Sequence, residues 1–182
     1  MKKFILFAAI LFAGVSMVKA EGEPEATYKQ SGSTTLTVEL KAIQSIIVDG
    51  QPTITYSTAD HYGLGASSEQ PNHLSVVSAG GYVIRVEADD LTSGGTDVIN
   101  AGSINVKATA GANSSGTVGT PLESGVTLAE STKDFITGSK GAVHQKYNVT
   151  YTGDKDFNYM VNYNADSKQT YTTTVHYTIS PK

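Results

Sequence analysis

Apolar and polar residues alternate along most of the chain, and the first clear run is residues 34–40. Its apolar members occupy every second position and are Leu36, Val38 and Leu40. Successive side chains of a β-strand point to opposite faces, so a period of two predicts a strand with one apolar face. No segment shows a helical stripe with caps, so strands are the expected element throughout.

A second pattern predicts a β-hairpin over residues 73–88. Two alternating runs, 73–78 and 82–88, are separated by Ala79-Gly80-Gly81. Short glycine-containing loops between such runs commonly join antiparallel neighbours. We therefore expect these two strands to pair with each other.

The C-terminal third is rich in threonine, valine and tyrosine, which favour strands. Alternation predicts strands over residues 143–151, 159–163 and 171–180. Tyrosines share a face with aliphatic residues here, and a mixed face of this kind predicts core. The aliphatic members are Val143, Val149, Val175 and Ile179, and the tyrosines are Tyr147, Tyr151, Tyr171 and Tyr177.

Short strands separated by turns rich in Gly, Asn, Asp and Ser are typical of two packed antiparallel sheets. We predict an all-β fold, an immunoglobulin-like antiparallel β-sandwich, as a single domain over residues 34–182. A closed barrel is the alternative.

Residues 1–20 have the layout of a secretory signal peptide. Lys2 and Lys3 give a positive start, an apolar run follows, and Ala20 ends a small-residue cleavage site. The run is too short to span a bilayer with margin, so we expect cleavage after Ala20 and no later membrane span. The product is expected at the cell surface or outside the cell, with the periplasm as an alternative. Residues 21–33 carry three glutamates and predict a flexible acidic arm.

Charge and cysteine content narrow the classes of partner and chemistry. The chain has 17 acidic and 13 basic residues, and residues 1–20 hold three of the basic ones and no acidic one, so residues 21–182 carry a net charge of −7. Phosphate groups are bound by clustered Lys and Arg, so this balance argues against nucleic acid and anionic membranes. The absence of cysteine excludes disulfides and thiol chemistry. We expect no cofactor.

Catalytic signatures are missing from the sequence. No serine lies in a Gly-x-Ser-x-Gly turn, and the histidines show no zinc-type spacing. We expect the four histidines to be solvated and the protein not to be an enzyme. They are His61, His73, His144 and His176.

Two acidic turns and one tyrosine are candidate ligand contacts. Asp89 and Asp90 form one turn, together with Glu87 and Asp97, and Asp154 and Asp156 alternate in the other. Alternating carboxylates suit calcium, although solvated turn acids are the alternative interpretation. Tyr62 lies in the sequence Asp-His-Tyr-Gly-Leu-Gly, which predicts a loop with an exposed ring able to stack on a ligand.

The strand predicted at residues 34–40 has two interpretations. It is either the first strand of its own sandwich or a strand that pairs with a neighbouring subunit. In the second case Leu36, Val38 and Leu40 would enter a groove of the partner, with backbone hydrogen bonds providing affinity.

Two segments carry a resemblance to known families. Residues 74–84 and 171–179 resemble WxL-type bacterial surface domains, with Tyr82-Val83-Ile84 and Tyr177-Thr178-Ile179 where that family has Trp-x-Leu elements. The ending also resembles the last strand of fimbrial-type subunits, as in exported surface proteins of Bacteroidota-like bacteria. The resemblance implies a non-enzymatic cell-surface sandwich. WxL domains themselves mediate attachment to peptidoglycan.

These observations favour a secreted, non-catalytic β-sandwich of the bacterial surface, acting as a structural or adhesive subunit. Its expected partners are further copies of itself or other surface proteins, joined by β-strand addition. The alternative is a carbohydrate- or peptidoglycan-binding module.

Overall fold

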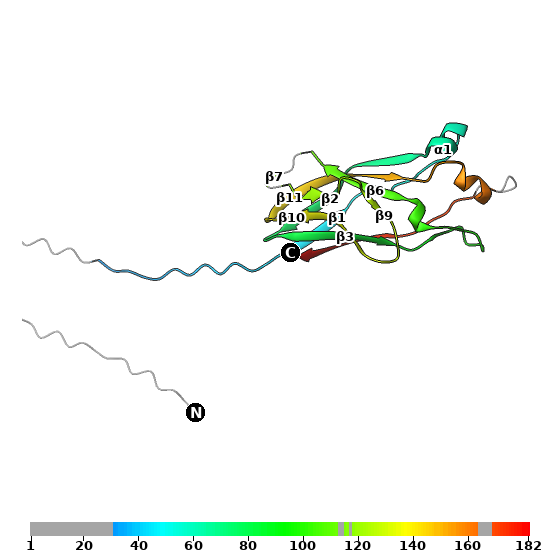
Figure 1. Ribbon diagram of the computed structural model, residues 1–182. Helices are drawn as coiled ribbons and strands as arrows, with labels where there is room; N and C mark the ends of the chain where they lie inside the picture. Colours follow the sequence, from blue (N-terminus) through cyan, green and yellow to red (C-terminus); the bar gives the residue numbers. More distant parts are fainter. Residues whose placement is uncertain (1–30, 113–114, 117, 164–168) are drawn as a thin grey trace, which may run out of the picture. The chain divides into compact units, whose positions relative to one another are not determined.

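The computed structural model describes residues 31–112, 115–116, 118–163 and 169–182 (Figure 1). The predicted signal peptide, residues 1–20, and most of the predicted acidic arm lie outside the described residues. The chain divides into two compact units, Met1–Val38 and Glu39–Lys182. Every described helix and strand belongs to the second unit.

Two antiparallel sheets make up most of this unit, which confirms the all-β prediction. Sheet A has the order β1-β2-β11-β6-β9, with β7 also paired to β11, and sheet B has the order β12-β3-β10-β8. The strands of sheet A are β1 (Gln44–Val48), β2 (Ser67–Ser78), β6 (Asn105–Ala110), β7 (Ser115–Gly116), β9 (Val126–Thr127) and β11 (Ala142–Thr152). Those of sheet B are β3 (Tyr82–Ala88), β8 (Thr120–Pro121), β10 (Lys133–Gly138) and β12 (Val175–Pro181).

Smaller elements gather at one end of the unit (Figure 1). The strands β4 (Leu91–Thr92) and β5 (Val98–Ile99) form a separate two-stranded sheet. The helical elements among the described residues are α1 (Ala59–Leu64) and two 3-10 turns, η1 (Ala101–Ser103) and η2 (Asn158–Asn162). None of the helices within the described ranges is long and apolar enough to cross a bilayer.

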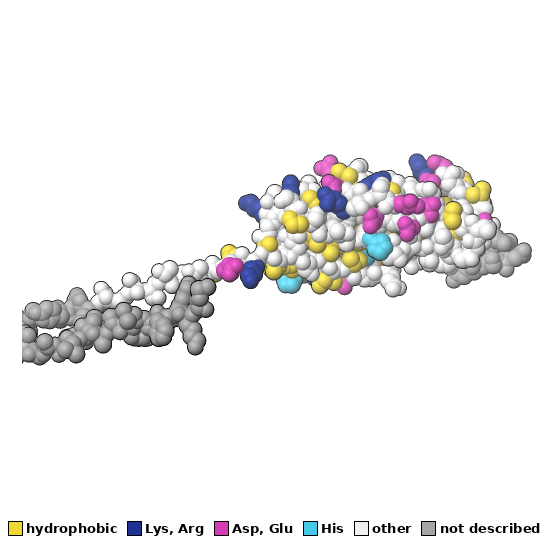
Figure 2. Space-filling model, turned by 90° about the horizontal axis from the view of Figure 1, so that it is seen from below, with side chains coloured by type: hydrophobic (Ala, Val, Ile, Leu, Met, Phe, Trp, Pro, Cys, Tyr) yellow, Lys and Arg dark blue, Asp and Glu magenta, His cyan; other side chains and the backbone are white. Residues whose placement is uncertain are grey.

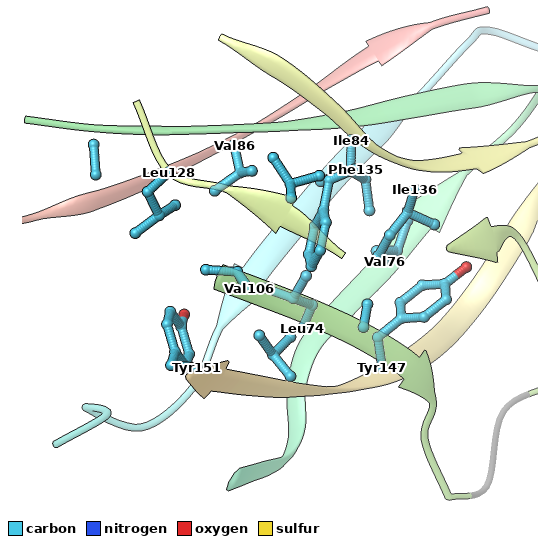
Figure 3. Close-up of a cluster of buried hydrophobic side chains, with 14 of the residues drawn as sticks. Leu74, Val76, Ile84, Val86, Val106, Leu128, Phe135, Ile136, Tyr147 and Tyr151 are labelled. Atoms are coloured by element: carbon cyan, nitrogen blue, oxygen red, sulfur yellow. The ribbon is translucent and has the colours of Figure 1, made fainter. Parts of the chain in front are cut away.

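The core fills the space between the sheets (Figure 3). Leu74 and Val76 of β2 and Ile84 and Val86 of β3 are almost completely buried. Phe135 of β10 lies among them and is also buried. Because every second residue of these strands points inward, each strand adds an apolar row to the same core.

The predicted hairpin over residues 73–88 is wrong. β2 pairs with β1 and β11 in sheet A, whereas β3 pairs with β10 and β12 in sheet B. The chain crosses from one sheet to the other at Ala79-Gly80-Gly81, so the inward residues of β2 and β3 face each other across the core. Alternation predicts the two strands equally well in either arrangement, since it does not specify the pairing partner.

The predicted tyrosine core is confirmed at Tyr147 and Tyr151, which are buried on β11, whereas Tyr177 is half-buried. Val143, expected on the same face, is 60% exposed. The register of β11 against β2 shifts between Ala142 and Gln145, where His144 has a φ of 50°. This bulge inserts an extra residue, so Val143 turns outward and Ala142 takes the inward position.

Three other local predictions are wrong. Residues 159–163 are not a strand, because most of them form the 3-10 turn η2. Residues 59–64 form a helix that begins after Thr58, whose hydroxyl accepts a hydrogen bond from the His61 amide at 3.2 Å. One turn of helix is too short to show a helical period in the sequence. The interpretation of residues 34–40 as the first strand of their own sandwich is also wrong, because they belong to neither sheet and the first described strand begins at Gln44.

Tyrosine hydroxyls link the two sheets at two levels. The Tyr82 hydroxyl of β3 lies 2.7 Å from that of Tyr147 on β11, and the Gly119 amide donates to the Tyr147 oxygen at 2.8 Å. Tyr151 of β11 and Tyr177 of β12 form a second hydroxyl pair at 2.7 Å. Burial raises the pKa of Tyr151 to about 12, so its hydroxyl remains a hydrogen-bond donor at neutral pH.

Candidate functional site

Residues 31–43 form no helix or strand. Leu36, Val38 and Leu40 have exposed fractions of 86%, 72% and 90%. Burying apolar side chains is the main driving force of protein association. A run of three such side chains at strand spacing, with no ladder partner in the described chain, is therefore the clearest candidate for an association element.

The second element of the site is the edge formed by β1 and β12. Among the described strands, β1 pairs with β2 only and β12 pairs with β3 only. The two edge strands lie close together, one from each sheet. An edge strand presents unpaired N–H and C=O groups that can receive a further strand.

The inward side chains along this edge are less buried than those of the central strands. Ile46 of β1 and the β12 residues Val175, Tyr177 and Ile179 pack against the core but are only partly buried. The matching residues of the neighbouring strands, such as Ile84 of β3, are almost fully buried. Within the described chain, the core is therefore incompletely covered on the β1–β12 side.

Residues 51–57, which follow β1 in the sequence, join no ladder among the described strands. Their alternate members Pro52, Ile54 and Tyr56 are half-buried, while the residues between them are exposed. Residues 53–56 thus have the side-chain alternation of a strand but no strand partner in the described chain. Ile54 packs against the core, which adds a further partly covered apolar residue.

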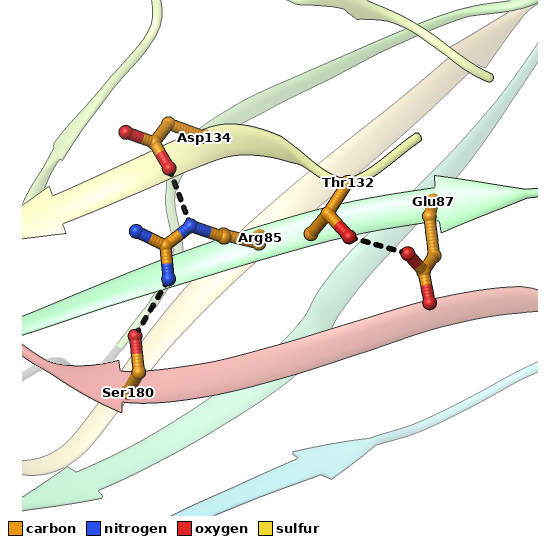
Figure 4. A network of polar contacts seen from close by, with 5 residues as sticks. All are labelled: Arg85, Glu87, Thr132, Asp134 and Ser180. Atoms are coloured by element: carbon orange, nitrogen blue, oxygen red, sulfur yellow. Dashed lines mark hydrogen bonds and ion pairs between the residues drawn. The ribbon is translucent and has the colours of Figure 1, made fainter. Parts of the chain in front are cut away.

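Polar contacts hold β12 in place from its outer face (Figure 4). Arg85 of β3 donates to the Asp134 carboxylate of β10 at 2.7 Å and to the Ser180 hydroxyl of β12 at 3.0 Å. Arg85 and Asp134 are both partly exposed, and pairs of this kind contribute little to stability. The two contacts link side chains of three neighbouring strands, β10, β3 and β12, on the outer face of sheet B.

A buried histidine connects β12 to sheet A. His73 lies inside the fold, so the predicted solvated role is wrong for this residue. Its Nδ1 is hydrogen-bonded to the Asp49 carbonyl oxygen, and its Nε2 lies 2.8 Å from the Tyr151 hydroxyl, which contacts Tyr177. Burial lowers the pKa of His73 below its ordinary value of 6.5, against the opposing effect of the Asp49 carbonyl.

His73 should make folding stability depend on pH. Because the folded state has the lower pKa, the unfolded chain binds the extra proton first as pH falls below about 6.5. Stability should therefore fall from that pH until the folded-state pKa is passed, by at most about 1.4 kcal/mol per pH unit. Urea unfolding of His73→Gln between pH 7.5 and 5 should show a flatter profile than the unaltered protein.

The exposed His176 provides the control for this experiment. His176→Gln should keep the pH profile of the unaltered protein. An unchanged profile in His73→Gln would mean that the buried imidazole is not the titrating group.

The predicted calcium residues lie in two separate places. Asp90 accepts the Ala101 amide at 2.7 Å, and the neighbouring Asp89 carbonyl accepts the Thr173 hydroxyl at 2.9 Å. Asp154 accepts the Lys155 amide and the Asn158 side-chain amide, each at 2.9 Å. Within the described ranges, no three His, Cys, Asp or Glu side chains gather as a metal site would need. Calcium binding at Asp89, Asp90, Asp154 and Asp156 stays a prediction.

The predicted ligand contact Tyr62 lies in helix α1 and not in a loop. Its ring is half-buried, with its centroid 5.2 Å from that of Tyr56. Tyr56 in turn packs edge-on against Tyr159 at 5.0 Å. Tyr62 is therefore part of an aromatic cluster that stiffens this end of the molecule, and its role as a direct contact stays a prediction.

Polar residues of the described chain give no clear catalytic constellation. Ser57 Oγ lies 3.3 Å from His61 Nδ1, but Nδ1 is also 3.2 Å from the Ser57 amide. No hydrogen bond to the other ring nitrogen of His61 is found within the described chain, so no third group orients the imidazole.

Two comparisons with known proteins found no relative. No protein-family model matches the chain, and no curated protein matches it significantly.

Proposed function

We propose that this protein is an exported, non-catalytic structural or adhesive subunit of a bacterial surface, which assembles by β-strand addition. Residues 34–40 of one copy add to the edge strand β12 of another. The two antiparallel sheets support an immunoglobulin-like sandwich, and the predicted signal peptide supports a location at the cell surface. In a secreted subunit of this kind, residues 34–40 act as the donor strand and the β1–β12 edge as its acceptor.

One observation carries the proposal: the exposed apolar side chains at residues 36, 38 and 40 have a counterpart in the partly covered edge. β12 spans seven residues, as does the segment 34–40, and its inward residues Val175, Tyr177 and Ile179 have the same spacing of two. Pairing would cover both rows at once and satisfy backbone groups on each strand.

The absence of cysteine makes disulfide trapping a clean test. Thr37 lies on the outer side of the donor segment, and His176, Thr178 and Ser180 lie on the outer side of β12. Directly opposed residues of paired strands are close enough to form a disulfide. Residues 21–182 carrying Thr37→Cys with one of His176→Cys, Thr178→Cys or Ser180→Cys should form a ladder of linked copies on a non-reducing gel.

Thr109 of β6 provides the control position, because it is exposed and belongs to a strand away from this edge. The pair Thr37→Cys with Thr109→Cys should give no ladder. If all three β12 pairs give only unlinked monomers, or monomers closed by an internal disulfide, addition between copies at β12 is excluded.

A further inference from the structure

A pocket of about 310 Å³ lies at the end of the molecule that carries α1 and the 3-10 turns. It opens on the outer face of sheet A and has a floor and two walls. The floor is made by strand residues, one wall by η1, and the other by α1 and the loop that follows β11. Its lining includes Ser103, Asn105, Thr127, Thr152, Asp154 and Lys155.

The floor is a straight row of polar side chains across three strands. In the sheet register Thr152 of β11 is opposite Asn105 of β6, and Asn105 is opposite Thr127 of β9. Each member of the row has a buried neighbour in its own strand: Tyr151 beside Thr152, Val106 beside Asn105, and Val126 beside Thr127. Because adjacent side chains of a strand point to opposite faces, the row points away from the core. Neighbouring strands lie about 4.8 Å apart, which sets the spacing of the three side chains.

These three side chains are free to bind a ligand. Within the described chain, Asn105, Thr127 and Thr152 make no side-chain hydrogen bond to the protein. Thr127 and Thr152 are exposed and Asn105 is half-buried. Together they offer hydroxyl and amide groups that can both donate and accept.

Tyr159 holds the two walls in fixed positions. Its hydroxyl lies 2.6 Å from Ser103 Oγ on one wall and accepts the Asp154 amide at 3.3 Å on the other. The loop after β11 is also attached to α1, because the Phe157 amide donates to the Tyr62 carbonyl at 2.8 Å. The pocket is thus largely preformed, which lowers the entropic cost of binding.

Backbone conformation in the same loop is costly. Asp156 and Phe157 have φ values of 58° and 61°, in the left-handed region that side chains other than glycine rarely adopt. Such residues persist where surrounding contacts enforce them, and they concentrate at ligand-binding sites. Contacts with α1 support this conformation, because the Asp156 amide donates to the Gly63 carbonyl at 3.2 Å, next to the bond from Phe157 to Tyr62.

The charge and polarity of the pocket select the class of ligand. The lining holds one carboxylate, on Asp154, and one ammonium group, on Lys155, which are adjacent and offset each other. The protein is acidic overall, and acidic side chains gather on the face shown in Figure 2. In the pocket itself, a phosphate or sulfate would meet the Asp154 carboxylate. Leu64, 78% exposed at the edge of the pocket, adds an apolar surface. A sugar ring carries uncharged hydroxyl groups and one apolar face, so it matches this lining.

We propose that this pocket binds a neutral saccharide. The hydroxyl groups of one or two sugar rings exchange hydrogen bonds with the row Thr127, Asn105 and Thr152, while a C–H face of the sugar lies against Leu64. The volume, at the lower end of the range for small-molecule sites, limits the bound portion to that size. This site is separate from the β1–β12 edge, so the two activities can be lost independently.

The test is to titrate residues 21–182 with maltotriose, cellotriose and N-acetylchitotriose and to measure binding by calorimetry or ligand-observed NMR. Inorganic phosphate is the anionic probe. At least one trisaccharide should bind, and phosphate should not. Asn105→Ala should weaken binding about tenfold, since it removes one hydrogen-bonding group. Thr152→Arg should abolish binding by filling the floor with a long side chain.

Thr109→Ala is the matched control, because Thr109 is exposed and points outward from β6 beyond the pocket. It should bind the sugar as the unaltered protein does. The proposal is overturned if no trisaccharide binds at millimolar concentration, if Thr152→Arg binds normally, or if phosphate is the preferred ligand. Unchanged disulfide laddering in Thr152→Arg would show that sugar binding and strand addition are distinct.

Discussion

Residues 21–182 carrying Val38→Asp are expected to remain monomeric at concentrations where the unaltered protein assembles. Val38 is exposed, so a carboxylate there should not disturb the fold of the single chain. In a paired donor strand the same side chain would enter the apolar β1–β12 edge, where burying an unpaired charge costs several kcal/mol. The association constant should fall by more than about 100-fold. Size-exclusion chromatography with light scattering measures the mass.

Thr37→Asp is the control, since it adds the same charge one residue away on the outer side of the donor segment. It should assemble normally, because its carboxylate would stay in solvent. Equal assembly of both variants would rule out the strand-addition mechanism. A Val38→Asp chain that is wholly unfolded by circular dichroism would instead mean that this segment belongs to its own sheet.

Gly138→Ala is expected to lower the free energy of unfolding by about 3 kcal/mol, at the upper end of what overpacking costs. Gly138 ends β10 and is opposite Tyr82 in the register of sheet B. A Cβ at this position would lie 2.2 Å from Tyr82 Cε1, and the Tyr82 ring is fully buried. The ring cannot move without breaking its hydroxyl contact to Tyr147. For a domain of this size the melting temperature should fall by roughly 6–12 °C.

Gly80→Ala is the matched control, because a Cβ at Gly80 would meet no atom within 4 Å. Its unfolding free energy should change by less than about 0.5 kcal/mol. If Gly138→Ala does not yield folded protein, the double variant Gly138→Ala with Tyr82→Leu should recover solubility, since leucine leaves room for the methyl group. A Gly138→Ala protein as stable as Gly80→Ala would contradict the close packing.

Sequence alternation predicted the fold class and much of the core correctly. Tyr147 and Tyr151 were expected to be buried because they share a strand face with Val149, and they are. The all-β class followed from the same signal, since short alternating runs leave no face for a helical core. These successes concern properties that each strand carries in its own sequence.

Properties that depend on the pairing of distant strands could not be predicted. The pocket floor requires Thr152, Asn105 and Thr127 to be in register, and nothing within β6, β9 or β11 specifies that alignment. A one-residue bulge at His144 was enough to move Val143 to the other face. Likewise, the mixed polar and apolar sequence around His73 gave no sign of its buried contacts with Asp49 and Tyr151.

The order of the strands also sets the time at which the chain can fold. β3 pairs with β12, and β2 pairs with β11. Neither sheet can therefore be completed before these two late strands, at residues 142–152 and 175–181, are available. Folds dominated by such long-range pairs form in milliseconds to seconds, far more slowly than helical bundles. A chain secreted from its N-terminus would emerge with the apolar strand β3 still unpaired and prone to aggregate. In the export that we propose, a factor that holds the chain until β12 has emerged would prevent this aggregation.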